Sequence, residues 1–186
     1  MTVKLRASGW EYGGKHLPWV WGQINYWDLD RSRWRDVLRA YHDAGQAVVS
    51  TAVLPRVHDA GAGRFKFDAS EPQKDLAGFL SEIQSQGLKV VLWIGPRDVP
   101  GVAAAGYTDA VLCDESALAR SAANGLIASA PTLSQDSFPL PCLLGEPLMT
   151  SLTAFSRALQ PVLAPFIHPD GPVIGLGLTQ APGWGP

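Results

Sequence analysis

Four aspartates of this 186-residue chain follow segments that read as β-strands. Asp28 and Asp30 come after the first segment, Asp59 after the second and Asp98 after the third. Barrels of parallel strands place their active sites where the carboxyl ends of the strands meet, and a carboxylate there can act as a general acid or base. Asp59 and Asp98 are therefore the candidates for a catalytic pair. The simpler interpretation is that Asp30 caps the next helix, Asp59 pairs with a neighbouring arginine, and Asp28 and Asp98 are solvated.

Tryptophans give a second kind of signal, because aromatic faces pack against sugar rings and are enriched at interfaces. Trp27 at the end of a strand and Trp184 in the C-terminal segment are candidates for contact with a ligand or partner. Trp34 falls on the apolar stripe of a helix and Trp93 falls within a strand. These two are expected to pack in the core.

The elements that must position these side chains alternate between strand and helix. Apolar runs at 20–26, 47–53, 89–94 and 173–178 are typical of parallel strands covered on both faces. Helices are expected over 30–41, ending at Gly45, and over 76–83, ending at Gly87. The Ala-rich stretch 115–130 reads as helical, 131–147 with its four prolines as an ordered loop, and 151–163 as a helix ended by Pro161 and Pro165.

The count of elements predicts a single α/β domain over residues 1–186. Residues 19–186 supply four β/α units, the last without its following helix, and residues 1–18 supply a short β-hairpin that turns at Gly13-Gly14. Four parallel strands leave two open sheet edges and an uncovered apolar face. We expect a homodimer, a second half-barrel chain, or a helix folded across the open side to cover them.

Composition excludes several classes of function. The net charge is −2, with lysines and arginines scattered singly, so neither nucleic acid nor a membrane surface is an expected partner. No apolar run reaches the length of a membrane span, and Met1–Arg6 lacks an apolar signal region, which predicts a cytoplasmic chain. Cys113 and Cys142 lack the spacing of metal ligands and are expected to be buried thiols. We expect no metal and no cofactor.

Several short motifs of this chain follow one another in the order found at the start of family 35 glycoside hydrolases, which are (β/α)8 barrels of the β-galactosidase type. The chain resembles that family well over residues 10–97 and more thinly over residues 171–181. The resemblance implies a (β/α)4 half of a TIM barrel and a carbohydrate ligand. The motifs include Gly22-Gln-Ile-Asn-Tyr26, Arg33-Trp34, Ala44-Gly45, Val49-Ser-Thr51, His58-Asp59, Gly63-Arg-Phe-Lys-Phe67, Gly87-Leu-Lys-Val90 and Gly95-Pro96.

The chain departs from the family pattern at the positions that carry chemistry. The family has Glu and His where this chain has Gln23 and Asn25, and the Asn-Glu that holds its general acid/base aligns with Gln180-Ala181. A Glu expected shortly after Gly95-Pro96 is also missing. Retaining hydrolysis needs two carboxylates about 5–5.5 Å apart, and the family's nucleophile lies in the second half of the barrel.

The resemblance therefore predicts a glycoside hydrolase-like half-barrel that is inactive by the family mechanism and retains at most carbohydrate or protein binding. The alternative is β-galactosidase-like hydrolysis from a split site, or from a rebuilt carboxylate pair at Asp59 and Asp98 in an oligomer. The residues expected to contact a ligand are Gln23, Asn25, Trp27, His58 and Gln180.

Overall fold

A computed structural model describes residues 3–18, 22–123, 125–131 and 137–178. Its contacts divide the chain into two compact units, where the sequence pattern predicts one domain. Unit 1 comprises residues 1–52, 67–93 and 161–177, and unit 2 comprises residues 53–66, 94–160 and 178–186.

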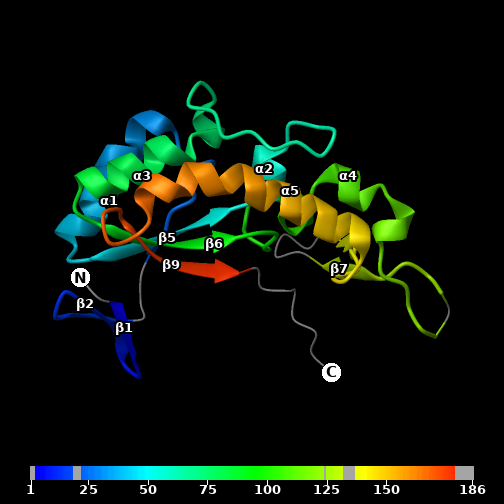
Figure 1. The fold of residues 1–186 in the computed structure, drawn as a ribbon, viewed down its shortest axis with the longest axis horizontal. Coiled ribbons are helices and arrows are strands. Elements are labelled where there is room, and N and C mark those ends of the chain that lie inside the picture. Colours follow the sequence, from blue (N-terminus) through cyan, green and yellow to red (C-terminus); the bar gives the residue numbers. More distant parts are fainter. Residues whose placement is uncertain (1–2, 19–21, 124, 132–136, 179–186) are drawn as a thin grey trace. The chain divides into compact units, whose positions relative to one another are not determined.

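The centre of unit 1 is a four-stranded sheet in the order β4-β5-β6-β9. Strands β5, β6 and β9 point the same way (Figure 1), and β4 pairs with β5 in parallel with Gly22 opposite Val49. The predicted α/β class with parallel strands is thus confirmed. Two of the predicted strands have the expected bounds, and the first is shorter than expected. The strands are β4 Gly22–Gln23, β5 Val48–Val53, β6 Lys89–Ile94 and β9 Val173–Leu178.

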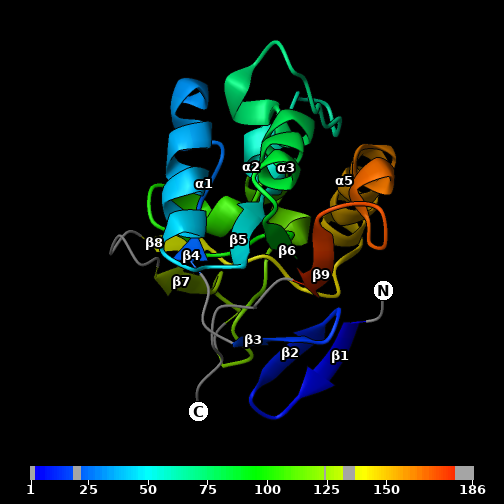
Figure 2. The same ribbon diagram turned by 90° about the vertical axis from the view of Figure 1, so that its left-hand side faces the viewer.

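Two helices cover one face of this sheet (Figure 2). A 3-10 turn, η1 (Arg31–Arg33), leads into α1 (Trp34–Asp43), and η2 (Pro72–Lys74) leads into α3 (Leu76–Ser85). Leu38 of α1 and Phe79 of α3 are fully buried, and the Trp34 ring meets the Phe79 ring edge-on at 5.2 Å. Trp34 is thus a core residue, as its helical position predicts.

The opposite face of the sheet carries a small antiparallel sheet built from the N-terminal residues (Figure 2). Its strands are β1 (Val3–Arg6), β2 (Gly9–Tyr12) and β3 (Lys15–Pro18) in that order, and the turn between β2 and β3 falls at Gly13-Gly14. The sequence predicts the second hairpin of this sheet and misses β1. Leu17 packs with Val48, Val91 and Ile174, so both faces of the parallel sheet are covered near its amino end.

Unit 2 is built from short elements around a separate core. They are α2 (Pro55–His58), η3 (Ala103–Gly106), α4 (Asp109–Leu112), η4 (Glu115–Ala117), β7 (Ser129–Pro131), β8 (Ser137–Pro139) and most of α5 (Glu146–Leu163). The last residues of α5 belong to unit 1, and η5 (Ala164–Phe166) follows them there. Tyr107, Phe138 and Leu148 are among the buried residues of this core.

The prediction of a helix over 115–130 is wrong. Only η4 is helical there, and the chain then extends, with Ala119 N–H donating to the Leu140 carbonyl and β7 pairing with β8. Alanine content favours a helix, but pairing with a distant segment of buried residues is worth more than that weak propensity. The same pairing places strand β8 inside 131–147, where the prolines predict only a loop.

The last long helix also differs from its prediction. It begins at Glu146 instead of Ser151, and Pro161 lies inside it. A proline removes one backbone donor without stopping a helix that is held by packing, and Phe155 and Leu159 of α5 are both buried. None of the described helices is long and apolar enough to cross a membrane. Cys113 is exposed and Cys142 half-buried, which corrects the expectation of two buried thiols.

Candidate functional site

The carboxyl end of β4 presents two neutral amide side chains. Gln23 Nε2 donates to Asn25 Oδ1 at 3.1 Å, and the Ile24 N–H between them donates to the Ser50 carbonyl at 2.8 Å. Gln23 is exposed and Asn25 half-buried, so the pair lies on the surface of unit 1. The two amides can donate and accept hydrogen bonds, but neither can transfer a proton at neutral pH. These two side chains are therefore suited to hydrogen bonding with hydroxyl groups, and neither of them can serve as a general acid or base.

Trp27 lies next along the chain and is mostly buried. The residue is 7% exposed, and its Nε1 donates to the Ala52 carbonyl at 3.0 Å, which fixes the loop after β4 to β5. Trp27 lines an open hollow of about 590 Å³ together with Asp28 and Asp30. Little of Trp27 is thus open to a ligand, and its indole N–H serves the fold.

Asp30 caps η1, as the simpler interpretation of its position predicts. Its Oδ1 accepts the Ser32 N–H at 2.8 Å and the Ser32 hydroxyl at 2.6 Å. These hydrogen bonds from the hydroxyl and then the backbone of Ser32 lower the pKa of the carboxyl. A carboxylate with a lowered pKa is a poor proton donor at neutral pH, so Asp30 does not fit the role of general acid.

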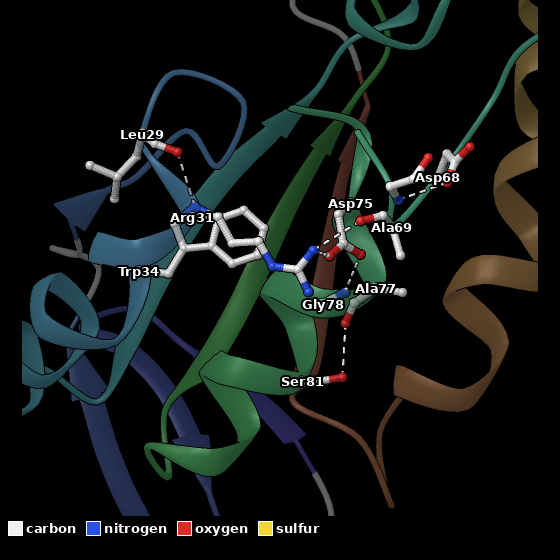
Figure 3. A network of polar contacts seen from close by, with 10 residues as sticks. Leu29, Arg31, Trp34, Asp68, Ala69, Asp75, Ala77, Gly78 and Ser81 are labelled. Atoms are coloured by element: carbon white, nitrogen blue, oxygen red, sulfur yellow. Dashed lines mark hydrogen bonds and ion pairs between the residues drawn. The ribbon is translucent and has the colours of Figure 1, made fainter. Parts of the chain in front are cut away.

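The loop after β4 is joined to α3 by a polar network (Figure 3). Arg31 Nη1 lies 2.9 Å from Asp75 Oδ2 and donates to the Ala69 carbonyl at 2.9 Å. Asp75 is the N-cap of α3, and its Oδ1 accepts the Gly78 N–H at 2.8 Å. The guanidinium also lies 5.7 Å from the centre of the Trp34 ring, within range of a cation–π contact. This network holds the rim in place and was not anticipated from the sequence, although an Asp directly before an apolar helix is a typical cap.

His58 belongs to unit 2 and has no exposed surface. Its Nδ1 lies 2.9 Å from the Lys66 carbonyl oxygen, which makes Nδ1 the donor, and its ring lies 6.4 Å from that of Phe155. A side chain enclosed in this way cannot contact a ligand. The prediction that His58 binds a ligand is thus corrected: it is a hydrogen-bonding partner within its own loop.

Asp59 closes a turn instead of pairing with an arginine. Its Oδ1 accepts the Gly61 N–H at 2.8 Å, and it lines a hollow of about 210 Å³ together with Asp114. Asp98, the other catalytic candidate, lies half-buried in the segment after β6 and makes contacts of its own.

The structure brings Gln23 and Asn25 together in unit 1 and places Asp59 and Asp98 in unit 2. Gln180, Ala181 and Trp184 lie outside the described residues. Within the described part of the chain, no group of three or more His, Cys, Asp or Glu side chains could hold a metal ion.

A parallel sheet with helices on one face and polar residues at its carboxyl edge defines an α/β fold of the kind that carries active sites at that edge. Residues 12–102 match the family described as glycosyl hydrolases family 35, which confirms the resemblance over this part of the chain. These residues are thus similar to part of a family 35 glycoside hydrolase domain.

The chain is also similar to curated proteins and to solved structures. The chain is 23% identical over 185 residues to an exo-beta-D-glucosaminidase of Thermococcus kodakarensis, covering 97% of this chain and 23% of the relative. It is 28% identical over 106 residues to a beta-galactosidase of Xanthomonas manihotis, covering 57% and 17%. An endo-1,4-beta-mannanase structure from Rhizomucor miehei aligns with a TM-score of 0.41 at 15% identity, covering 50% and 29%. The chain thus spans less than a quarter of the length of these two curated relatives.

Proposed function

We propose that the rim at β4 binds a carbohydrate without hydrolysing it by the family mechanism. The observation that carries the proposal is the Gln23–Asn25 pair, which places two hydrogen-bonded amides where the family pattern has Glu and His. Amides hydrogen-bond sugar hydroxyls as both donors and acceptors, so they suit binding. They carry no titratable proton, so they do not suit acid–base catalysis.

The names of the relatives suggest the class of ligand. An exo-beta-D-glucosaminidase and a beta-galactosidase are named for β-linked hexosides, so the proposed ligand is a β-linked galactoside or glucosaminide. Trp27, two residues after Asn25, lines an open hollow and supplies an apolar group there. The matched segments make up only 23% and 17% of these two relatives, so the proposal is confined to binding at this rim.

A second copy of the chain is the proposed partner. Strand β9 lies at one edge of the sheet, and two of its apolar side chains are largely exposed, Leu176 at 52% and Leu178 at 79%. An unpaired edge with exposed leucines favours association, and two-fold pairing is the commonest form of it. A two-fold dimer that joined β9 of each copy to β4 of the other would pair both open edges of each sheet.

Binding is tested by titrating the purified chain with methyl β-D-galactoside and methyl β-D-glucosaminide while recording backbone amide resonances. We expect saturable shifts at the end of β4 with a dissociation constant of about 1 mM, a value typical of a few hydrogen bonds and one ring contact. The double variant Gln23→Ala, Asn25→Ala should weaken binding about tenfold or more. Gln160→Ala, at an exposed position of α5, is the matched control and should bind as the unchanged chain does.

Turnover is tested in parallel with 4-nitrophenyl β-glycosides. Hydrolysis by the unchanged chain would overturn the proposed inactivity. Loss of that hydrolysis in Asp59→Asn or Asp98→Asn, with Asp43→Asn as a control on the surface of α1, would then support a rebuilt carboxylate site. Absence of both turnover and saturable binding would overturn the proposed function as a whole.

A further inference from the structure

Helix α5 presents a largely exposed face within unit 2. Its opposite side packs into the fold through Leu148, Phe155 and Leu159, all of which are buried. Six residues on the outer side line an open hollow of about 390 Å³, and their spacing of three, four and seven residues places them along one side of the helix. They are Glu146, Met149, Thr150, Thr153, Ala154 and Arg157, and we call them the α5 face. All but Ala154 are exposed.

The two ends of the α5 face carry opposite charges. Glu146 and Arg157 are both exposed, and neither forms an ion pair with another described residue. Both lie on one continuous helix, whose rise per residue separates their backbones by about 16 Å. That distance is too long for the two side chains to pair with each other in one copy. A partner that neutralises both charges must therefore carry them in the reverse order.

A second copy of the α5 face has this reverse order when it lies antiparallel to the first. A two-fold axis through the middle of the face sets Glu146 of each copy opposite Arg157 of the other. The same axis sets Met149 opposite Ala154, a long flexible side chain against a small one, and Thr150 opposite Thr153. A parallel arrangement would instead set like charges against each other. The face is thus complementary to itself in one orientation.

We propose that the α5 face is the docking surface for a second copy of this chain, packed as an antiparallel pair of helices. The small side chains at its centre allow the helix axes to approach to about 8–10 Å. A single helix face buries much less than the roughly 1,600 Å² of a standard interface, so the pairing is weak, with a dissociation constant of about 0.1–1 mM. Copies already joined through β9 would be linked into larger assemblies by this second surface.

The inference does not rest on carbohydrate binding, because the Gln23–Asn25 rim belongs to unit 1 and the α5 face to unit 2. The test is a dilution series, from about 1 mM to about 20 µM, of the chain that carries Leu176→Lys and Leu178→Lys. These two changes remove pairing through the edge strand, so any remaining association reports another surface. We expect backbone amide resonances of α5 to shift with concentration and the rotational correlation time to rise with them.

Charge reversal identifies the partner and its orientation. In the same background, Glu146→Arg and Arg157→Glu each bring like charges together and should weaken association about tenfold or more. The double variant Glu146→Arg, Arg157→Glu restores both ion pairs and should associate within about threefold of the unreversed chain. A mixture of the two single variants should also associate, because one copy then carries only positive charges on this face and the other only negative ones.

Asp36→Arg is the matched control. Asp36 is exposed in the first turn of α1, as Glu146 is in the first turn of α5, so the change of charge and its place in a helix are the same. It should leave association unchanged. A chain that shows no association at about 1 mM would overturn the proposal in favour of a different partner. A loss that neither the double variant nor the mixture recovers, or an equal loss in Asp36→Arg, would also overturn it.

Discussion

Arg31 and Asp75 form an ion pair in which one partner is exposed and the other is buried. Arg31 Nη1 lies 2.9 Å from Asp75 Oδ2, and their side chains are 48% and 3% exposed. Asp75 also caps α3 through Gly78. One carboxylate thus joins the loop after β4 to the start of a helix more than forty residues further along the chain.

Removal of either partner is expected to destabilise unit 1. Asp75→Ala loses the cap and the ion pair, and should lower the free energy of unfolding by about 2 kcal/mol. Arg31→Ala leaves a buried carboxylate without its cation and should cost a similar amount. Urea unfolding followed by circular dichroism measures both. Asp30→Ala removes an exposed cap from η1 and should lower the free energy of unfolding by less than either of the other two changes. An equal cost for all three variants would contradict this account.

The Asp114 carboxyl should titrate below its ordinary pKa of 3.8. A carboxyl whose pKa is lowered by folding contributes stability above its unfolded pKa and loses it as the pH falls through the folded value. Ser116→Ala removes the hydroxyl that is the first cause of the shift, so the pKa of Asp114 should rise toward 3.8. Carboxyl carbon NMR over acid pH measures it. Ser156→Ala, whose hydroxyl donates to Leu152 in α5, should leave the pKa of Asp114 unchanged.

Ala62 lies in the left-handed region with φ of 52°, in the loop that follows Asp59. This conformation costs a residue with a Cβ about 1–2 kcal/mol, and Ala62→Gly removes that cost. Glycine also has the greater conformational entropy in the unfolded chain, which offsets part of the gain, so the net stabilisation should be up to about 1 kcal/mol. Ala60→Gly, also exposed and in the same loop without a positive φ, is the control and should destabilise by roughly 0.5 kcal/mol. If thermal unfolding showed that both variants change the stability in the same direction, the explanation from the backbone conformation of Ala62 would be refuted.

The proposed dimer predicts a dependence on the edge strand. Light scattering across a concentration series should give twice the mass of one chain at micromolar concentration. Leu176→Lys with Leu178→Lys should give a monomer, because charges on an edge strand oppose pairing. Leu144→Lys changes a leucine that is 90% exposed away from β9 and should remain dimeric. A well-folded monomer of the unchanged chain would rule out this partner.

Strands β6 and β9 could be predicted to the residue because each is mainly apolar, and β6 is also bounded by Gly87 and Gly95. The first strand could not, because its apolar run continues past the sheet: the Asp28 N–H bonds back to the Asn25 carbonyl, so the backbone turns there. Tyr26 and Trp27, which lie inside this turn, are themselves largely apolar. The spacing of apolar residues therefore does not mark the point where strand pairing stops.

The candidate site was predictable only where neighbours in sequence are neighbours in space. Gln23 and Asn25 are two residues apart on one strand end, and they bond to each other. His58 was misjudged because its burial depends on Phe155, almost a hundred residues away. The missing cap at α4 could not be foreseen either, because a threonine before a helix normally caps it and Thr108 does not.

The amide pair at the end of β4 also determines how the rim responds to acidity. A hydrolase that relies on one protonated and one ionised group has a bell-shaped activity profile, because each limb reports the titration of one group. Gln23 and Asn25 stay neutral at every pH that the fold survives. A sugar held by this pair would keep the same affinity in a mildly acidic vesicle as in a neutral compartment.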